Sequence, residues 1–326
     1  MATKQIPADY ATMTLYTTTY LNVLTFTEAE VAEITGEISD ILAITFGGYT
    51  GESATNTLTI KPASGQGIRD NANKLTNALR YNSANGAALT NSVGSSTAAY
   101  YFTDPYFIID GLQIKNTNAA CTYMLRIENT TSNGVVKNNV LVGTLVNSGR
   151  VFQQNSSTCA SNNNLVINLS TTSAGGILVR NSQSNCVSVA LNGATGIGML
   201  GLYATSSVIK NCAVYGYGAN DYSATVSASS ASNATDQASF GGTNWGANGG
   251  QTSLVGATEW ESVTAGSEDF RLKSTSAKLK ANGASPTLST DIVNTAWNAA
   301  KDIGVWTFNA AAANNNNQSF FLMAGA

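Results

Sequence analysis

Few side chains in this sequence are able to do chemistry. The chain has 326 residues and no histidine, which removes Ser-His-Asp and Cys-His nucleophilic catalysis and every metal site that needs an imidazole. Charged residues make up only 11% of the chain, and the formal net charge is −3. We therefore expect no metal and no cofactor.

The carboxylates of the central region are few and scattered. They are Asp104, Asp110 and Glu128. Hydrolysis of a glycosidic bond needs two carboxyl groups about 5–9 Å apart. These three do not recur at the interval of the repeat described below, which would bring two of them together. Three arginines nearby fall at unequal offsets in the same way: Arg126, Arg150 and Arg180. We expect no catalytic residues and no enzymatic activity.

The four cysteines do not form a metal or redox motif. Cys121, Cys159, Cys186 and Cys212 show no C-x-x-C spacing. We expect buried, reduced thiols that serve as small apolar side chains. The repeat makes Cys186 and Cys212 stacked neighbours, so a disulfide between them is geometrically conceivable, although a pair of free thiols fits a reducing compartment better.

A degenerate repeat organises residues 107–218. Its anchors recur at nearly equal steps along the sequence, and they are Gly111, Asn138, Asn163, Asn185 and Asn211. Around the anchors lie short runs rich in Val, Ile and Leu, joined by polar Asn, Ser and Gly turns. Such runs are too short for helices and are typical of strands. Several short strands per repeat predict an all-β fold, a parallel β-helix in which each coil hydrogen-bonds to its neighbours.

Asparagine at the anchors predicts stacked turns. Asn tolerates the left-handed backbone conformation, and its amide can bond to the same residue in the next coil. A second register with a similar step contains Asn129, Asn155, Asn181 and Thr205. We expect it to form another ladder, with left-handed geometry at Asn155.

The repeat needs covers at both ends. We expect an N-terminal cap over residues 1–40, the β-helix over 41–222, a C-terminal capping region over 223–308 and an arm over 309–326. Thr27-Glu-Ala-Glu30 reads as a capping box, and Ala29, Val31, Ala32 and Ile34 then predict a short amphipathic helix. Residues 62–104 suggest an early coil with a long excursion, and residues 223–258, rich in Ala, Ser, Gly and Asn, are expected on the surface.

Two apolar groups are candidates for an interface. In the arm, a polar run of asparagines precedes Phe320, Phe321, Leu322 and Met323, which are too apolar to remain in water. An aromatic cluster over residues 100–107 contains Tyr101 and Phe102. It is suited to core packing, to an interface patch or to a sugar platform.

Targeting and surface charge point to a protein made in a cytoplasm. The first residues lack the apolar stretch of a signal peptide, and no stretch of uninterrupted apolar residues approaches the length of a membrane span. With an isoelectric point near 5.0, we expect neither nucleic-acid nor membrane binding.

Three segments resemble motifs of a known family. Asp9-Tyr-Ala-Thr-Met-Thr-Leu15 is similar to the "DYATL" opening of right-handed parallel β-helix proteins, of the pectate-lyase-like type, encoded by many tailed bacteriophages. Segment 268–277, EDFRLKSTSA, resembles the "DFRLKSTSPA" element that often closes such helices, with Ala277 in place of the usual proline. Segment 301–306, KDIGVW, is similar to the "DIGAYEY" signature that follows it.

The resemblance implies a right-handed parallel β-helix and a place in a virion. The first hypothesis is a non-enzymatic decoration or cement protein on the capsid exterior, synthesised in the host cytoplasm, with the major capsid protein and further copies of itself, as a homotrimer, as partners. The first alternative is a tailspike or receptor-binding fibre that recognises a host surface polysaccharide, and the second is a secreted polysaccharide lyase or adhesin. Enzymes of this fold use Asp pairs with a His, or Ca²⁺-binding carboxylate clusters with an Arg base, and this chain shows neither pattern.

Overall fold

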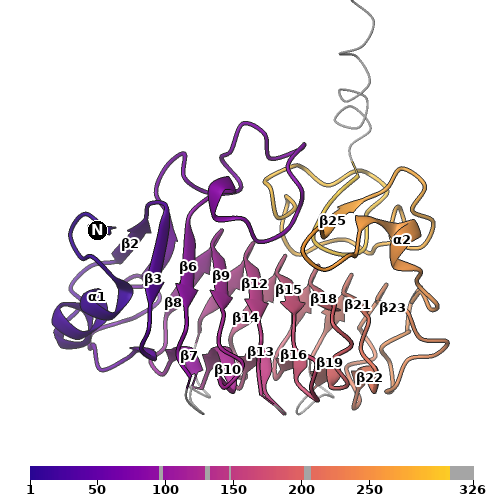
Figure 1. The fold of residues 1–326 in the computed structure, drawn as a ribbon, viewed down its shortest axis with the longest axis horizontal. Helices are drawn as coiled ribbons and strands as arrows, with labels where there is room; N and C mark the ends of the chain where they lie inside the picture. Colours follow the sequence, from indigo (N-terminus) through magenta and orange to yellow (C-terminus); the bar gives the residue numbers. More distant parts are fainter. Residues whose placement is uncertain (95–97, 129–132, 147, 202–206, 309–326) are drawn as a thin grey trace, which may run out of the picture.

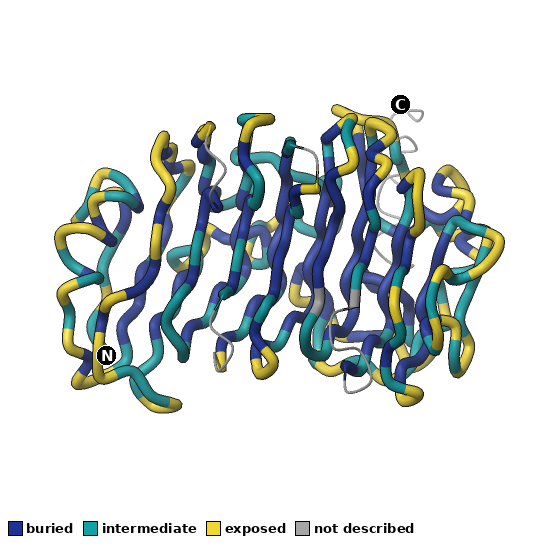
Figure 2. The backbone as a smooth tube through the Cα atoms, turned by 90° about the horizontal axis from the view of Figure 1, so that it is seen from below, coloured by how far each residue is buried: buried dark blue, intermediate teal, exposed yellow. Residues whose placement is uncertain are grey.

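The chain winds into a parallel β-solenoid of about eight turns, so the all-β prediction is confirmed (Figure 1). The computed structural model describes residues 1–94, 98–128, 133–146, 148–201 and 207–308. Each turn contributes strands to three parallel sheets. Burial is concentrated along the strands, whereas exposed residues gather at the turns (Figure 2).

The three sheets run the length of the solenoid and are called sheets 1, 2 and 3. Sheet 1 contains, in spatial order, β1 (Ala2–Ile6), β2 (Glu30–Ile34), β5 (Leu58–Pro62), β8 (Phe107–Asp110), β11 (Val135–Lys137), β14 (Ala160–Asn162), β17 (Gln183–Ser184) and β20 (Ile209–Lys210). Sheet 2 contains β4 (Ile44–Phe46), β7 (Ala98–Phe102), β10 (Tyr123–Ile127), β13 (Arg150–Gln154), β16 (Gly175–Val179), β19 (Ile197–Gly201) and β22 (Asn220–Ser223). Sheet 3 contains β3 (Glu37–Asp40), β6 (Ala88–Asn91), β9 (Gln113–Asn116), β12 (Val140–Gly143), β15 (Leu165–Asn168), β18 (Val187–Ala190), β21 (Ala213–Tyr215) and β23 (Ala234–Thr235).

The predicted turn between sheets 1 and 3 is confirmed, coil by coil. Its residue has a positive φ in five successive coils: Gly111 (76°), Asn138 (59°), Asn163 (53°), Asn185 (57°) and Asn211 (55°). The strands before it pair in the register that this alignment requires, with Lys137 opposite both Asp110 and Asn162. The amide of Asn163 donates to Asn138 Oδ1 at 3.1 Å, which is the expected ladder bond.

A second column of residues, one position further on, faces the interior of the solenoid. It consists of Asn139, Asn164, Cys186, Cys212 and Asn233, all fully buried. Asn164 Oδ1 accepts from the backbone N–H of Asn139 at 3.1 Å, and the same bond recurs between Asn233 and Cys212 at 3.0 Å. The side chains of this column therefore link adjacent coils. All four cysteines are free and buried, as expected.

The second predicted register is wrong. In sheet 2, Phe152 pairs with Leu125 on one side and Ile177 on the other, so the steps from coil to coil are unequal. Asn155 consequently lies beside Glu128, to which its amide donates at 2.7 Å, and its φ is not positive. The amide of Asn181 donates to the carbonyl of Cys159 at 2.9 Å, not to Asn155, while Asn129 and Thr205 lie outside the described residues.

The N-terminal segment is part of the first coils, not a separate cap. Residues predicted as a helix form β2, whose two edges are hydrogen-bonded to β1 and β5. The helix of this region is α1 (Met13–Thr19), where the hydroxyl of Thr12 accepts from the N–H of Leu15 at 3.1 Å. Pairing on both edges outweighs the capping-box signal at residues 27–30, because β1 and β5 supply backbone partners along the whole length of β2.

The N-terminal end of the solenoid is closed by α1 and by Asp9. The outer edge of β1 has no neighbouring strand among the described residues. There the N–H of Gln5 donates to Asp9 Oδ2 at 2.8 Å, and the carbonyl of Gln5 accepts from the N–H of Asp9 at 2.7 Å. Edge groups occupied in this way are unavailable to another chain. Helix α1 and the 3₁₀ turn η1 (Leu21–Val23) cover the start of sheets 2 and 3, and Thr14 bonds to Asp40 at 2.7 Å.

The C-terminal region closes one end of the solenoid and then folds back along its side. Trp245 is buried against Tyr222, at 4.5 Å between ring centroids, and its Nε1 donates to Ala224 O at 2.8 Å. Residues 254–308, which we call the flank, then cover the outer face of sheet 3 (Figure 1). They include α2 (Gly256–Glu259), β24 (Trp260–Ser262) and β25 (Asp269–Leu272). The prediction of a simple end cap over 223–308 is therefore incomplete, since part of it is a third layer.

The strands β12, β15 and β18 of sheet 3 are buried on both faces because the flank covers them. Side chains such as Leu141 and Val166 point into the solenoid, whereas Val140, Leu165 and Val187 point outward into a separate apolar cluster. The excursion between β5 and β6 adds Ile68 and Leu79 to that cluster. The flank contributes the largest share, which consists of Leu254, Trp260, Phe270, Leu272, Leu279, Ile292, Val293, Ile303, Val305 and Trp306.

Candidate functional site

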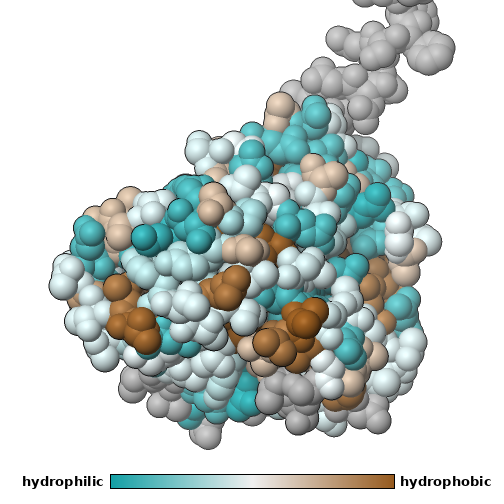
Figure 3. Space-filling model, turned by 60° about the vertical axis from the view of Figure 1, so that its left-hand side comes forward, coloured by the Kyte–Doolittle hydropathy of each residue, from teal (hydrophilic) through white to brown (hydrophobic). Residues whose placement is uncertain are grey.

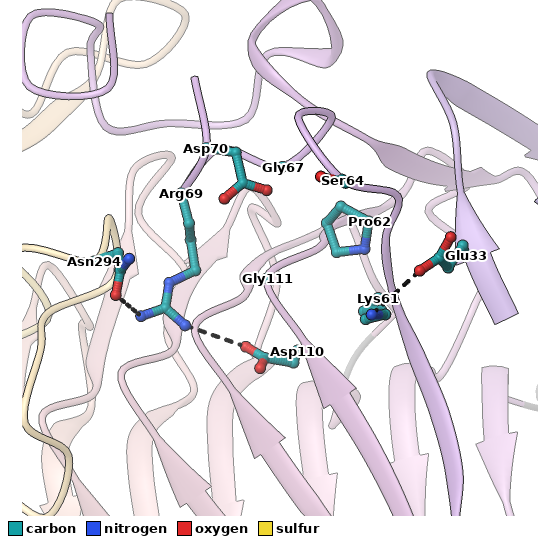
Figure 4. A pocket seen from close by; sticks show the side chains of 10 residues that line it. All are labelled: Glu33, Lys61, Pro62, Ser64, Gly67, Arg69, Asp70, Asp110, Gly111 and Asn294. Atoms are coloured by element: carbon teal, nitrogen blue, oxygen red, sulfur yellow. Dashed lines mark hydrogen bonds and ion pairs between the residues drawn. The ribbon is translucent and has the colours of Figure 1, made fainter. Parts of the chain in front are cut away.

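A polar cleft lies on the outer face of sheet 1, next to the turn of positive-φ residues (Figure 4). Its volume is about 320 Å³. Sheet 1 supplies the floor, the excursion between β5 and β6 supplies one wall, and the flank supplies Asn294. The lining residues are Glu33, Lys61, Pro62, Ser64, Gly67, Arg69, Asp70, Asp110, Gly111 and Asn294.

The floor carries charges of alternating sign from coil to coil. Glu33 of β2 pairs in register with Lys61 of β5, at 3.2 Å between Nζ and Oε1. Asp110 of β8 lies opposite Lys137 of β11, at 3.2 Å between Nζ and Oδ2. Opposite charges on neighbouring strands are the favourable cross-strand arrangement. Most of the charge on the floor is therefore neutralised by its own neighbours.

Arg69 connects the floor to the flank. Its guanidinium lies 3.6 Å from Asp110, and its Nη2 donates to Thr290 Oγ1 at 3.0 Å and to Asn294 Oδ1 at 3.2 Å. The residues so joined lie far apart in the sequence. Arg69 consequently has a structural role, because it joins the excursion to β8 and to the flank.

Asp70 and Ser64 line the cleft but take no part in the ion pairs of its floor. No interaction joins either of them to the other side chains drawn in Figure 4. Asp70 also borders a second cleft of about 300 Å³. Its lining includes Gly36, between β2 and β3, and Ser83 of the excursion. A carboxylate acceptor and a hydroxyl beside the ion pairs make the cleft suitable for hydrogen bonding to a hydroxyl-rich ligand.

The carboxylates identified in the sequence do not meet in one site. Asp110 lies on the floor of the cleft, where it pairs with Lys137 and Arg69. Glu128 follows β10 and pairs with Arg126 at 2.7 Å. Asp104 follows β7, and burial raises the pKa of its carboxyl.

The aromatic cluster divides between core and surface. Phe102 is buried and stacks on Phe46 at 4.2 Å, so its assignment to an interface is wrong. Strand alternation explains this, because Tyr101 and Phe102 point to opposite faces of β7. Tyr101 is half-buried and lies 5.3 Å from the guanidinium of Arg126. The interface candidates of the arm, Phe320, Phe321, Leu322 and Met323, lie outside the described residues.

Comparison with protein-family models, with curated proteins and with solved structures gives no match. In the part of the chain that the structure describes, no helix has the length and apolar character to cross a membrane. The described residues also contain no group of three or more Cys, Asp or Glu side chains arranged for a metal ion.

The motif carboxylates near the C-terminus serve the fold. Asp269 accepts from the N–H of Leu79 at 3.0 Å and binds the guanidinium of Arg271 through both oxygens. Asp302 is buried and accepts from the N–H groups of Ala281 and Phe308, both at 2.7 Å. Such bonds satisfy buried backbone donors in irregular segments. These motifs therefore hold the flank in place.

A buried carboxyl group, Asp221, lies beside the half-buried Asp236 at the C-terminal end of the solenoid. Asp221 is 1% exposed, and its Oδ2 accepts from the N–H of Asp236 at 3.0 Å. Burial, together with the neighbouring carboxylate of Asp236, raises the pKa of Asp221 to about 8.

We expect the stability of the protein to fall as the pH rises through this pKa. The pKa of Asp221 is about 8 in the folded protein, against roughly 3.9 in an unfolded chain, so the folded state holds the proton more tightly. The stabilisation is complete below pH ~4 and is lost progressively towards pH ~8. Melting temperatures on the acid and alkaline sides of this window measure it, and Asp221→Asn should reduce the difference. An equal difference in wild type and variant would contradict the assignment.

Proposed function

We propose that the protein is a non-enzymatic structural component of a bacteriophage virion, a decoration or cement protein on the outer surface of the capsid. The observation that carries the proposal is the use of the motif carboxylates. Asp9 closes the free edge of β1. Asp269 joins the flank to Leu79 in the excursion between β5 and β6, and Asp302 fixes the loops of the flank to one another. Carboxylates of the three motifs that resemble phage β-helix proteins thus stabilise the fold.

The charges of the cleft support the same proposal. Glu33, Lys61, Asp110 and Arg69 are engaged with neighbouring charged or polar groups. A general acid needs a proton at the reacting bond, and a general base needs a free lone pair there. Ion pairs within a rigid sheet supply neither, so the arrangement favours a structural or binding role.

Labelling of purified particles tests the location. An antibody against this protein, visualised by electron microscopy with a gold conjugate, should decorate the capsid shell at many positions. The major capsid protein should be recovered with it after mild crosslinking. Label confined to the tail tip would support the receptor-binding alternative, and particles without label would refute a virion role.

We also expect the purified protein to cleave no polysaccharide. Incubation with acidic and neutral polysaccharides, with and without Ca²⁺, should release neither reducing nor unsaturated ends, because Asp110 and Glu128 are held in separate ion pairs and form no acid–base couple. A polysaccharide lyase run in parallel serves as the positive control. If ends are released, Asp104, Asp110 and Glu128 are the first residues to replace, and activity that depends on one of them would overturn the proposal.

The second candidate function is glycan recognition, as in a receptor-binding protein. It is favoured by the cleft, where Asp70 and Ser64 remain available beside Lys61. Titration calorimetry with oligosaccharides of the host surface distinguishes the two candidates. Binding that is abolished by Asp70→Ala, but retained by a substitution of the exposed Asn73 nearby, would favour this alternative.

A further inference from the structure

Exposed apolar side chains gather at the N-terminal end of the solenoid. Among the described residues, most of the large apolar side chains that stand exposed belong to α1, η1 and the turn between β3 and β4. Leu15, Val23, Ile41 and Leu42 are called the N-terminal patch, and their exposures are 45%, 76%, 75% and 57%. Figure 3 shows several apolar areas, separated by more polar residues, on the face that includes the end of the molecule with α1.

The patch is held on a firm support. Thr14, beside Leu15, bonds to Asp40, beside Ile41, through both its N–H at 3.0 Å and its hydroxyl at 2.7 Å. The carbonyl of Leu42 accepts from the amide of Asn91 at 2.8 Å. Helix α1 buries Met13 and Tyr16 against the first coils, so its opposite side, which carries Leu15, faces the solvent. The backbone that carries Leu15, Ile41 and Leu42 is thus held in position, which lowers the entropic cost of binding a partner.

The chain itself contains a segment suited to this patch. Residues 309–326 carry no charged side chain, and the segment includes the apolar tip Phe320-Phe321-Leu322-Met323. The patch is equally composed of apolar side chains. The two segments match in chemistry, and apolar side chains exposed together on a protein surface are characteristic of an interaction site.

The starting point of the arm favours the patch of a second copy over its own. The flank near the arm is attached to late coils, because the N–H of Gly304 donates to Asn211 O at 2.8 Å and Asn185 donates to Gly304 O at 3.1 Å. From β17 to β1 there are six intervals in sheet 1, about 29 Å at ~4.8 Å each. Segment 309–319 spans at most about 40 Å when fully extended. The chain's own arm would have to use about 29 Å of its maximum reach of about 40 Å along the solenoid before it turned around the end.

We propose that the tip of the arm, residues 320–323, docks on the N-terminal patch of a second copy of this chain. The two surfaces of such a contact are different, so each copy gives one arm and receives one. A heterologous contact of this kind closes into a ring when the rotation between copies allows it. The expected homotrimer is a ring of this kind. The proposal does not depend on the protein being part of a virion.

Two full-length variants test the contact separately. The patch variant combines Leu15→Ser, Val23→Ser, Ile41→Ser and Leu42→Ser, and the tip variant combines Phe320→Ser, Phe321→Ser, Leu322→Ser and Met323→Ser. Light scattering after size-exclusion chromatography should show an oligomer for the wild type and monomers for both variants. The dissociation constant should rise by about 100-fold or more in each variant, because four apolar side chains are lost from the contact.

Mixing the two variants gives the decisive measurement. The patch variant still offers an intact tip, and the tip variant still offers an intact patch. The mixture should form a 1:1 dimer that grows no further, which also demonstrates that both variants are folded. Val255→Ser is the matched control, since Val255 is 57% exposed but lies on the flank, and it should leave the oligomer unchanged. A monomeric wild type, an undiminished patch variant, a mixture without dimers or dissociation of the control would each overturn the proposal.

Discussion

Replacing Asn164 by leucine is expected to lower the free energy of unfolding by about 3–5 kcal/mol. Asn164 is fully buried in the interior column between sheets 1 and 3. Its Oδ1 accepts from the N–H of Asn139 at 3.1 Å, and its Nδ2 donates to Val136 O at 2.8 Å. Leucine fills a similar volume but leaves the N–H of Asn139 buried without its acceptor, at a cost of about 1–3 kcal/mol. It also removes the bonds of Asn164 to Val136 O and Ser161 Oγ, which are worth about 0.5–1.5 kcal/mol each.

Equilibrium unfolding in urea measures this loss. A protein of this size is stabilised by roughly 5–15 kcal/mol in total, so the midpoint should move by a large fraction of its value. Asn73→Leu is the matched control, because Asn73 is exposed and its substitution should change stability by less than about 0.5 kcal/mol. If Asn164→Leu were as mild as the control, the interior column would not be what links the coils.

The turn between sheets 1 and 3 was predictable from the sequence for a physical reason. A left-handed backbone conformation excludes most residue types, so Asn138, Asn163 and Asn185 mark the same point in successive coils. In the turns that follow sheet 2, the described asparagines Asn155 and Asn181 are not held in that conformation. Asn155 adopts no left-handed conformation, and asparagine there marks no fixed position. The asparagines in this register are regularly spaced in the sequence, but the paired strands follow one another at unequal steps.

The N-terminal helix was misplaced because local signals competed with long-range pairing. Thr27-Glu-Ala-Glu30 has the pattern of a capping box, yet β2 receives hydrogen bonds from β1 and β5. Glu30 pairs with distant residues in both directions, Ala2 before it and Leu58 after it, and such partners leave no trace in the local sequence. Where tertiary pairing is available on both edges, it overrides a marginal helix signal.

The sequence of sheet 3 indicates that a further layer covers it, but not which part of the chain forms that layer. Strands buried on one face alternate apolar and polar residues, whereas strands buried on both faces are apolar throughout. Val140-Leu141-Val142 and Leu165-Val166-Ile167 are continuous apolar runs, which indicates that something covers the outer face of sheet 3. The identity of the cover was not predictable, because it comes from residues 254–308 at the far end of the chain.

The cleft shows the same limit for the candidate site. Its residues come from three separate regions, represented by Glu33, Asp70 and Asn294. Of the lining carboxylates only Asp110 was noted in the sequence, and its partners on neighbouring elements were not. The alternation of charge along the floor, which begins with Glu33 and Lys61, becomes visible only when the register of sheet 1 is known. Cross-strand neighbours are set by the lengths of the intervening turns, which the sequence pattern does not determine.

Replacing Asp302 by alanine is expected to release the flank while leaving the solenoid folded. Asp302 is 1% exposed and accepts hydrogen bonds from the N–H groups of Ala281 and Phe308 and from the hydroxyl of Thr307 at 2.9 Å. Two backbone donors lose a charged acceptor in the variant, which costs roughly 3–5 kcal/mol locally. The segment around residues 279–308 contains no named helix or strand among its described residues, so it should open before the sheets do.

Hydrogen exchange and limited trypsin digestion follow this opening separately from global unfolding. In Asp302→Ala, cleavage at Lys278, Lys280 and Lys301 should accelerate by about 100-fold or more, the factor that corresponds to ~3 kcal/mol, while the amides of β12, β15 and β18 remain protected by their neighbours in sheet 3. Lys301→Ala alters the adjacent residue of the same motif, and its amides should exchange as in the wild type. The outer face of sheet 3 would then be uncovered in Asp302→Ala, and this variant should aggregate with rising concentration. Simultaneous loss of protection in flank and solenoid would show instead that the two form one cooperative unit, with Asp302 stabilising the whole molecule and not only its third layer.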